Sequence, residues 1–318
     1  MLDREQEGLA GEGRGAPATG SMTGAADVSV VIPVYNRAHV VARAVRSVQA
    51  QSVPVREIIL VDDGSSDDSL AVIRALAGED ERIVVLSQQN GGAAAARNTG
   101  MARAGGEWIA FLDSDDEWLP GKLAAMQSHL ADSEVGFVFS SNLYDKHGEP
   151  VDGPLLKPEE GCDKLWITGK FLIKTSAVLF RRGLLQDTGM FCETLQTCED
   201  YEFFWRLIAV SPRIAYIPER LNTIHLGPDG LTQSNSEERL RRDDIRAMDR
   251  ACGWLAGRAG TGGLIRALKD VQYNSFVQVL NWRLSERDWR AVLSDMAWCR
   301  RSLGLPTALY ALASAMRG

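Results

Sequence analysis

The sequence predicts an α/β protein with a mostly parallel central sheet flanked by helices, followed by a helical extension at the C-terminus. Two observations predict this class. Short apolar runs alternate with helical patterns from residue 28 to residue 112, and such alternation is typical of a parallel sheet covered on both faces. From about residue 237 onward the pattern is helical only, which indicates an all-helical addition to the sheet.

The individual elements follow from their apolar periodicity. The first helix is predicted because Val41, Ala44, Val45 and Val48 share one helical face. We expect strands at 28–34, 57–61, 83–86 and 108–112, with helices around 41–48, 70–76 and 93–104. After a run at 135–140 the alternation is lost, and we expect a long polar loop at 145–170, a strand at 177–181, an aromatic helix at 201–210 and a return to the sheet at 218–223.

Composition divides the chain into three predicted regions: a disordered leader (1–26), the sheet domain (27–236) and the helical extension (237–318). The leader lacks the apolar stretch of a signal peptide. The net charge of -7 argues against a general nucleic-acid binder. Residues 239–318 nevertheless carry 14 Arg and Lys against 7 Asp and Glu. This basic extension could contact an anionic membrane surface, an acidic partner or the acidic body of its own chain.

Cysteine usage and hydropathy predict a cytoplasmic protein. The five cysteines are odd in number and have no C-x-x-C spacing, as expected for reduced thiols. No apolar run reaches the roughly 18–20 residues needed to cross a bilayer. The tryptophans of the extension would serve packing, an oligomer interface or peripheral contact with the inner face of the cytoplasmic membrane.

The most informative segment is 108–116, where five apolar residues are followed by Asp113, Ser114, Asp115 and Asp116. Carboxylates gathered at a strand exit repel one another unless a cation or a proton lies between them. A hard divalent ion such as Mg²⁺ or Mn²⁺ suits such ligands. The alternative is a solvated acidic turn in which Asp116 caps a helix near Pro120.

Two earlier strand exits carry similar signals. In the first, Pro33 ends strand pairing, Tyr35 offers a face on which a base could stack, and Asn36 could cap a helix. In the second, Gly64 permits a tight turn, and Ser66 or Asp67 could cap the next helix. Two adjacent carboxylates, Asp62 and Asp63, exceed what capping needs, and one could accept a hydrogen bond from a base or a ribose.

A third segment, 90–100, places two glycines before an Ala-rich helix that contains Arg97. It is neither the G-x-G-x-x-G fingerprint nor a phosphate loop, which counts against dehydrogenases and P-loop enzymes. Ligands of open α/β sheets bind at the carboxyl ends of the strands, where these segments converge. Further along, Glu199 and Asp200 open the aromatic helix, and an acid there could be a general base or simply favour the helix dipole. His225 is either structural or a contact to metal or diphosphate.

Together these segments resemble a family-two inverting glycosyltransferase of the GT-A fold, the fold of nucleotide-diphospho-sugar transferases. The resemblance covers roughly residues 28–232 and rests on motifs in a fixed order: Pro-x-Tyr-Asn after the first strand, Val-Asp-Asp-Gly-Ser, Ala-Arg-Asn-x-Gly, Asp-Ser-Asp-Asp and a late Glu-Asp. The chain departs from the pattern at 189–193, which reads Gly-Met-Phe-Cys-Glu where similar enzymes often have Gly-Gly-Phe-Asp-Glu. This departure bears on the acceptor loop more than on the reaction class.

The resemblance implies roles for individual residues. Pro33, Tyr35 and Asp63 would hold the nucleobase, while Asp62, Arg97 and Asp113 would contact ribose and diphosphate. Asn36, Arg37 and Ser114 would complete the nucleotide-sugar site. Asp115 would bind the metal, with Asp113 and Asp116 close by, and His225 is a secondary candidate ligand. Asp200 would be the catalytic base, oriented by Glu199.

The implied activity is metal-assisted transfer of a sugar from a UDP- or dTDP-sugar to a glycan or lipid-linked acceptor, with inversion in a single displacement. Two alternatives remain. A sugar nucleotidyltransferase should show a Gly-rich loop with Arg and Lys where 33–37 stands. A catalytically inactive binding or scaffold module would be expected to lose acids at the metal or base position, and both are present.

Overall fold

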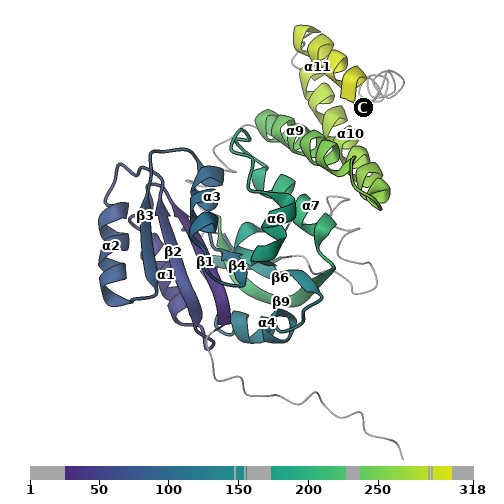
Figure 1. The fold of residues 1–318 in the computed structure, drawn as a ribbon. Helices are drawn as coiled ribbons and strands as arrows, with labels where there is room; N and C mark the ends of the chain where they lie inside the picture. Colours follow the sequence, from purple (N-terminus) through teal and green to yellow (C-terminus); the bar gives the residue numbers. More distant parts are fainter. Residues whose placement is uncertain are drawn as a thin grey trace, which may run out of the picture.

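The computed structural model describes residues 26–146, 148–153, 155, 173–226, 237–285, 287 and 289–302. Four parallel strands form one half of a single sheet, in the order β3-β2-β1-β4. They are β1 (Ala26–Val34), β2 (Val55–Asp62), β3 (Ile83–Ser87) and β4 (Trp108–Phe111). The intervening helices are α1 (Val41–Gln49), α2 (Ser69–Glu79) and α3 (Ala93–Arg103). The predicted alternation is therefore confirmed in this half (Figure 1).

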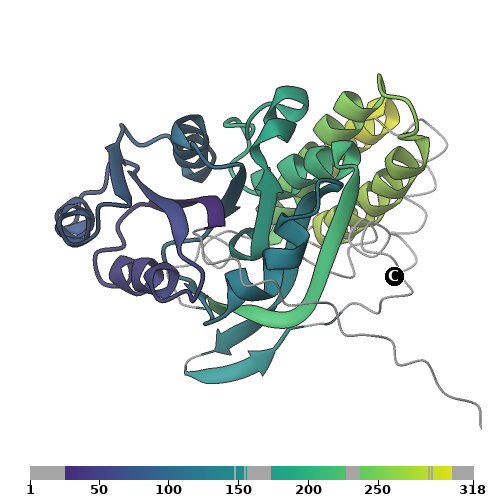
Figure 2. The same ribbon diagram turned by 60° about the horizontal axis from the view of Figure 1, so that its bottom comes forward.

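The second half of the sheet is mixed. β8 (Val178–Arg181) pairs antiparallel with both β4 and β6 (Val135–Lys146), and β6 runs parallel to β9 (Arg213–His225). The two-residue β5 (Glu117–Trp118) joins β9, and α4 (Lys122–Leu130) follows it. Figure 2 shows the strong curvature of β9, in green. The sheet is thus curled, with the parallel character limited to its first half and the β6–β9 pair.

The loop predicted at 145–170 is partly wrong. β6 continues to Lys146, and β7 (Glu149–Asp152) pairs back on it. A hairpin forms here because Gly148 supplies a positive φ of 89°, a conformation that glycine adopts at little cost. Residue 154 and residues 156–172 lie outside the described part of the chain, as does the leader up to residue 25.

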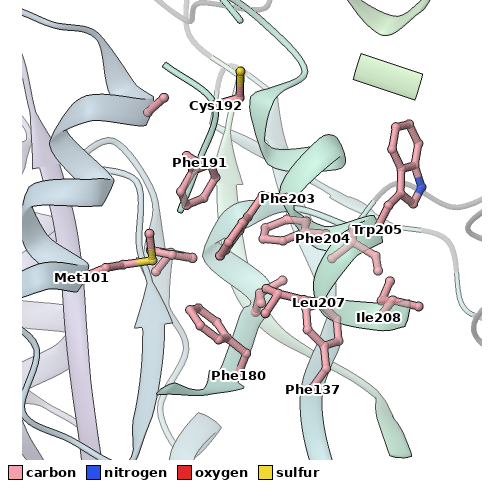
Figure 3. Close-up of a cluster of buried hydrophobic side chains, with 14 of the residues drawn as sticks. Met101, Phe137, Phe180, Phe191, Cys192, Phe203, Phe204, Trp205, Leu207 and Ile208 are labelled. Atoms are coloured by element: carbon pink, nitrogen blue, oxygen red, sulfur yellow. The ribbon is translucent and has the colours of Figure 1, made fainter. Parts of the chain in front are cut away.

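Two apolar clusters cover the two faces of the sheet. Successive residues of β1 alternate between them: Val31 belongs to the cluster under α3, and Val30 and Ile32 to the cluster under α1 and α2. The first cluster also contains the aromatic side of α7 (Glu199–Val210), where Phe191 stacks on Phe203 at 4.2 Å between ring centroids. Figure 3 shows these rings between α3 and α7.

The extension consists of α9 (Glu237–Leu255), α10 (Gly262–Ser285) and α11 (Trp289–Ser302). Met248, Cys252 and Leu255 of α9 belong to the same apolar cluster as the aromatic residues of α7. The Arg250 Nε lies 3.3 Å from a Glu202 carboxylate oxygen of α7. The first helix of the extension therefore packs on the body, Leu268 of α10 joins the same cluster, and α11 lies farther out (Figure 1). The predicted boundary at 236/237 stays a prediction.

Candidate functional site

The strand register brings the predicted segments to one edge. Val34 at the end of β1 is paired with Asp62 of β2, and Val31 of β1 is paired with Phe111 at the end of β4. Because parallel strands exit at the same edge, residues 35–37, 63–67 and 113–116 must emerge beside one another. The edge predicted from sequence is the edge that the structure forms.

The acidic pair after β2 is buried and fully engaged by the chain. Asp62 accepts hydrogen bonds from the Ser65 N–H at 3.3 Å and the Ser87 hydroxyl at 3.2 Å. Asp63 accepts three, and its partners are the Gln88 amide (2.8 Å), the Gly91 N–H (2.9 Å) and the Gly92 N–H (2.8 Å). Asp63 thus lies at the N-terminus of α3, where the helix dipole favours a negative charge. A contact from Asp63 to a nucleobase would be an addition to these three bonds.

The loop after β1 is tied to the loop after β2. Asn36 has a positive φ of 53°, and its side-chain oxygen accepts the Ser66 N–H at 2.8 Å. Asn36 does not cap a helix: α1 begins five residues later, with Val40 at its N-cap position and no capping side chain. The Arg37 N–H donates to the Ser69 hydroxyl at 2.7 Å. Tyr35, at 48% exposure, stands out from this fixed loop and presents its ring to solvent.

Arg97 joins the acidic exit of β4 to the start of α7. One guanidinium nitrogen donates to Asp113 at 2.8 Å and another to Glu199 at 2.8 Å, and the side chain is only 6% exposed. Burial alone would lower the pKa of Arg97, but the two carboxylates raise it instead. Since Asp200 follows Glu199, this bridge brings the predicted base to the predicted nucleotide edge.

Asp113 and Asp115 differ from Asp116. Asp113 and Asp115 keep about a third of their side chains exposed (32% and 34%), and the Arg37 Nε lies 3.6 Å from Asp115. Burial raises the pKa of Asp115, and the neighbouring Asp113 charge adds to the rise. Ser114, between them, is buried.

Asp116 is an internal residue, so the helix-cap interpretation is wrong. It is 5% exposed and accepts hydrogen bonds from the Ser176 hydroxyl and the His225 N–H. Burial raises the pKa of Asp116 well above its usual range, and Asp113 and Asp115 contribute further. It cannot cap α4 because β5 intervenes, and Gly121 occupies the N-cap position of that helix.

The predicted base pair lies at the N-terminus of α7. Cys198, its N-cap residue, has a positive φ of 61°, an uncommon conformation for a residue with a side chain. Asp200 accepts hydrogen bonds from the Tyr201 N–H at 2.9 Å and the Thr175 hydroxyl at 3.2 Å. Burial raises the pKa of Asp200, while the charges of Arg97 and Lys174 oppose the rise. Burial and Asp200 likewise raise the pKa of Glu199.

His225 lies between two carboxylates. Its Nδ1 is 2.8 Å from Asp145 and its Nε2 is 2.7 Å from Glu117. Glu117 also lies 3.2 Å from the Arg43 Nε. The ring therefore ties β6, β9 and β5 together, and it would have to release one carboxylate to become a metal ligand.

The chemistry of the donor set fits a divalent cation at Asp113 and Asp115. Within the described residues, no three His, Cys, Asp or Glu side chains are arranged as a complete metal site. Mg²⁺ and similar ions, however, are commonly held by one or two carboxylates together with substrate phosphates. Asp113 and Asp115 supply two partly exposed carboxylates whose mutual repulsion a cation would relieve.

Four further side chains contact the predicted site residues or the segments that carry them, although the sequence predicted no role for them: Gln88, Asn98, Thr175 and Ser176. Asn98 appeared only as the Asn of the Ala-Arg-Asn-x-Gly motif. Gln88 holds Asp63, as described above. Asn98, the residue after Arg97, exchanges two hydrogen bonds with the backbone of Phe191 (2.9 and 3.1 Å). Ser176 bonds to the turn after β4. A polar pair before the strand predicted at 177–181 was the only available signal for Thr175 and Ser176.

Comparison with known proteins agrees with this geometry. A family model described as "Glycosyl transferase family 2" matches residues 29–189. An uncharacterised glycosyltransferase of Nostoc is 28% identical over 277 residues, covering 81% of this chain and 85% of that protein. A Campylobacter jejuni GalNAc(5)-diNAcBac-PP-undecaprenol beta-1,3-glucosyltransferase is 34% identical over 166 residues, covering 50% of this chain and 53% of its own length.

Solved structures share the fold. Staphylococcus aureus TarS 1–349, determined in complex with UDP-GlcNAc, has a TM-score of 0.63 at 18% identity, covering 92% of both chains. The mannosyltransferase PcManGT of Pyrobaculum calidifontis, determined with GDP-Man and Mn²⁺, has a TM-score of 0.57 at 19% identity and covers 93% of this chain and 76% of its own. In the described part of this chain, no helix combines the length and apolar character needed to span a bilayer.

Proposed function

Because this chain belongs to glycosyl transferase family 2, we propose that it is an inverting enzyme that transfers a hexose-type sugar from a UDP- or dTDP-sugar to an acceptor hydroxyl. One observation carries the proposal. Buried Arg97 bonds at once to Asp113, at the nucleotide edge, and to Glu199, beside the candidate base. A donor sugar held over Asp113 and an acceptor held over Asp200 would then meet at a single place.

Each part of the edge has a role in this proposal. Tyr35 stacks on the base next to Pro33, and Asp62 and Asp63 contact base and ribose. Asn36 and Arg37 shape the loop, while Arg97, Asp113 and Ser114 face the diphosphate. Mn²⁺ or Mg²⁺, held by Asp113 and Asp115 with His225 as a further candidate ligand, would supply neutralisation of the charge on the leaving diphosphate.

Asp200 is the proposed general base. It takes the proton of the acceptor hydroxyl while that oxygen bonds to the anomeric carbon, and the bond from this carbon to the phosphate oxygen breaks. A raised pKa suits a carboxylate that must accept a proton near neutral pH. A single displacement of this kind inverts the anomeric configuration and needs no covalent intermediate. Glu199 contributes through Arg97, to which it is bonded.

A lipid-linked glycan is the acceptor class that we favour, because the Campylobacter jejuni relative is named for an undecaprenyl-linked one. A cytoplasmic location, with peripheral docking at the membrane, belongs to the same proposal. Deleting the whole extension would be a poor test, since α9 contributes to the core of the body. Charge reversal of the exposed Arg287, Arg290 and Arg300 preserves that core. Equal flotation of this variant and the unaltered protein with anionic liposomes would rule out docking through these arginines.

Turnover of UDP- and dTDP-sugars, with Mn²⁺ or with a chelator, tests the activity. We expect Asp200→Asn to lower kcat by about 100-fold or more, the scale of general-base catalysis, while calorimetry shows unchanged affinity for UDP with Mn²⁺. The matched control is Asp187→Asn, at an exposed carboxylate of α6 (Leu185–Thr188). Unchanged turnover in Asp200→Asn would remove Asp200 from the base role. Nucleotide binding by the unaltered protein without any turnover would favour an inactive binding module.

A further inference from the structure

The 3₁₀ turn Thr175–Ala177 lies beside the acidic exit of β4 because of antiparallel pairing. β8, which follows this turn, pairs with β4 in the register Ile109–Phe180 and Ala110–Leu179. Extending that register beyond the last paired residues places Ser176 opposite Asp113. The residues that precede β8 therefore emerge at the edge where β4 ends, next to the proposed metal and diphosphate ligands.

Ser176 holds this acidic exit through both its side chain and its backbone. Its hydroxyl accepts the Asp113 N–H at 3.1 Å and donates to an Asp116 carboxylate oxygen. Its carbonyl accepts hydrogen bonds from the Trp118 indole and the Lys122 ammonium, each at 3.0 Å. Ser176 is fully buried. It thus fixes the backbone from which Asp113 and Asp115 project.

Thr175 reaches in the other direction. Its hydroxyl donates to the Oδ2 of Asp200 at 3.2 Å, and the residue is 5% exposed. The other charged or titratable groups that interact with Asp200 come from several elements: Arg97 on α3, Asp113 after β4, Lys174 before the 3₁₀ turn, Cys198 at the N-cap of α7, and Glu199 and Tyr201 on α7. Among the hydrogen bonds to Asp200 described above, that from Thr175 comes from outside its own helix.

We propose that Thr175 and Ser176 form a positioning element that fixes the proposed base relative to the nucleotide and metal carboxylates. Thr175 holds Asp200, Ser176 holds the 113–116 turn, and the peptide bond between them sets the separation of the two. The inference rests on the proposed role of Asp200. Its physical basis is that proton transfer requires the base within hydrogen-bond reach of the acceptor hydroxyl, and small misplacements cost rate.

The test compares Thr175→Val, which removes the hydroxyl and keeps the shape, with Thr175→Ser, which restores a hydroxyl. Thr261→Val is the matched control, because Thr261 is also buried and donates its hydroxyl to the Leu255 carbonyl in the extension. Carboxyl ¹³C NMR titration of Asp200, assigned with Asp200→Asn, reports the base directly. Calorimetry with UDP and Mn²⁺ reports the nucleotide side, and the pH dependence of kcat reports catalysis.

We expect Thr175→Val to raise the pKa of Asp200, because a hydrogen bond to the ionised form is lost. The acidic limb of the kcat profile then moves to higher pH, and kcat falls about tenfold, the scale of one hydrogen bond to a charged group. UDP affinity should stay within about twofold, since Thr175 contacts no proposed nucleotide ligand. Thr175→Ser should restore the profile, and Thr261→Val should leave it unchanged.

Ser176→Ala should instead weaken UDP binding in Mn²⁺, by about tenfold. An unchanged pKa of Asp200 in Thr175→Val, or unchanged UDP affinity in Ser176→Ala, would overturn the positioning role. The pKa of Asp200 measured by NMR tests whether Thr175 holds Asp200, and this test does not require that the protein transfers a sugar. Absence of UDP binding and of donor turnover in the unaltered protein, beside a shifted pKa in Thr175→Val, would instead contradict the proposed function and leave the coupling in place.

Discussion

The edge of the sheet carries two acidic turns that look alike in sequence but differ in structure. The first acidic turn, Asp62-Asp63, begins at the last residue of β2, and the second, Asp113-Ser114-Asp115, follows β4. In the first, both carboxylates are at most 3% exposed and accept five hydrogen bonds from the chain. In the second, both carboxylates stay about one-third exposed, with guanidinium groups as the neighbouring cations.

The difference arises from what surrounds each turn. Gly64 approaches the 88–92 loop so closely that a Cβ there would lie 2.8 Å from the Asn90 nitrogen. This approach lets Gly91 and Gly92 direct their N–H groups at Asp63. After β4, Asp115 has no comparable set of backbone donors among the residues that the structure describes, and its charge is opposed by Asp113. On this basis we propose that acids at a strand exit form a cation site when the chain supplies too few hydrogen-bond donors to neutralise their charge.

The largest expected effect separates the two turns by their response to Mn²⁺. Asp115→Asn should weaken UDP binding in Mn²⁺ by about 100-fold. Substitutions of residues that hold a metal, or that support its ligands, typically lower metal affinity by about this factor. The affinity should then no longer depend on the metal. Asp62→Asn should lower affinity less and keep the dependence on Mn²⁺. Calorimetry with UDP, with and without Mn²⁺, measures both, and equal behaviour of the two variants would erase the distinction between the turns.

The fold of the first turn is the more vulnerable. Asp63→Ala removes an acceptor from three donors. Because Gly91 and Gly92 are exposed, water can reach their N–H groups, and each lost hydrogen bond costs about 0.5–1.5 kcal/mol. We expect the free energy of unfolding to fall by about 2 kcal/mol, measured by urea denaturation. Asp113→Ala removes a partly exposed acceptor, so a smaller loss is expected. A larger loss in Asp113→Ala than in Asp63→Ala would contradict the assignment of the first turn as the structural one.

The common edge was predictable from sequence, because parallel strands joined by helices must exit on the same side. That rule applies locally: Tyr35, Asp62 and Asp113 each follow directly after an apolar run that is visible in the sequence. The difference between the partly exposed acids of the second turn and the buried Asp116 that follows them was not predictable in the same way. Asp116 was open to interpretation as a helix cap because a two-residue strand such as β5 is too short to leave a periodic pattern.

The positioning residues were hidden for a different reason. Ser176 reaches Asp113 through antiparallel pairing of β8 with β4, two segments far apart in the chain. Such pairing depends on the tertiary fold and leaves no local signature. Gln88 and Asn98 escaped because a polar side chain near a helix start is common, and only the structure shows what each one holds.

The smallest expected effect is a gain in stability, opposite in sign to the losses expected for Asp63→Ala and Asp113→Ala. Burial and Asp113 raise the pKa of Asp115 in the folded protein, so folding favours its protonated form. Stability from this group is therefore greatest at low pH and is lost as the pH rises from the unfolded value of 3.8 through the folded pKa. At neutral pH Asp115→Asn removes the unfavourable charge. Because the side chain is about one-third exposed, solvent screening limits the gain, and we expect Tm to rise by about 1–2 °C.

UDP with Mn²⁺ should raise the Tm of the unaltered protein by mass action. The same ligands should raise the Tm of Asp115→Asn much less, because that variant binds UDP more weakly. Thermal denaturation at neutral pH, with and without these ligands, gives both numbers from one protein. A fall in Tm of the ligand-free variant would mean that Asp115 is held by its contact with Arg37 and is structural, like the acids of the first turn. A higher Tm of the ligand-free variant, together with a smaller rise in Tm on adding UDP and Mn²⁺, would instead show that the charge of Asp115 contributes to ligand binding and destabilises the fold.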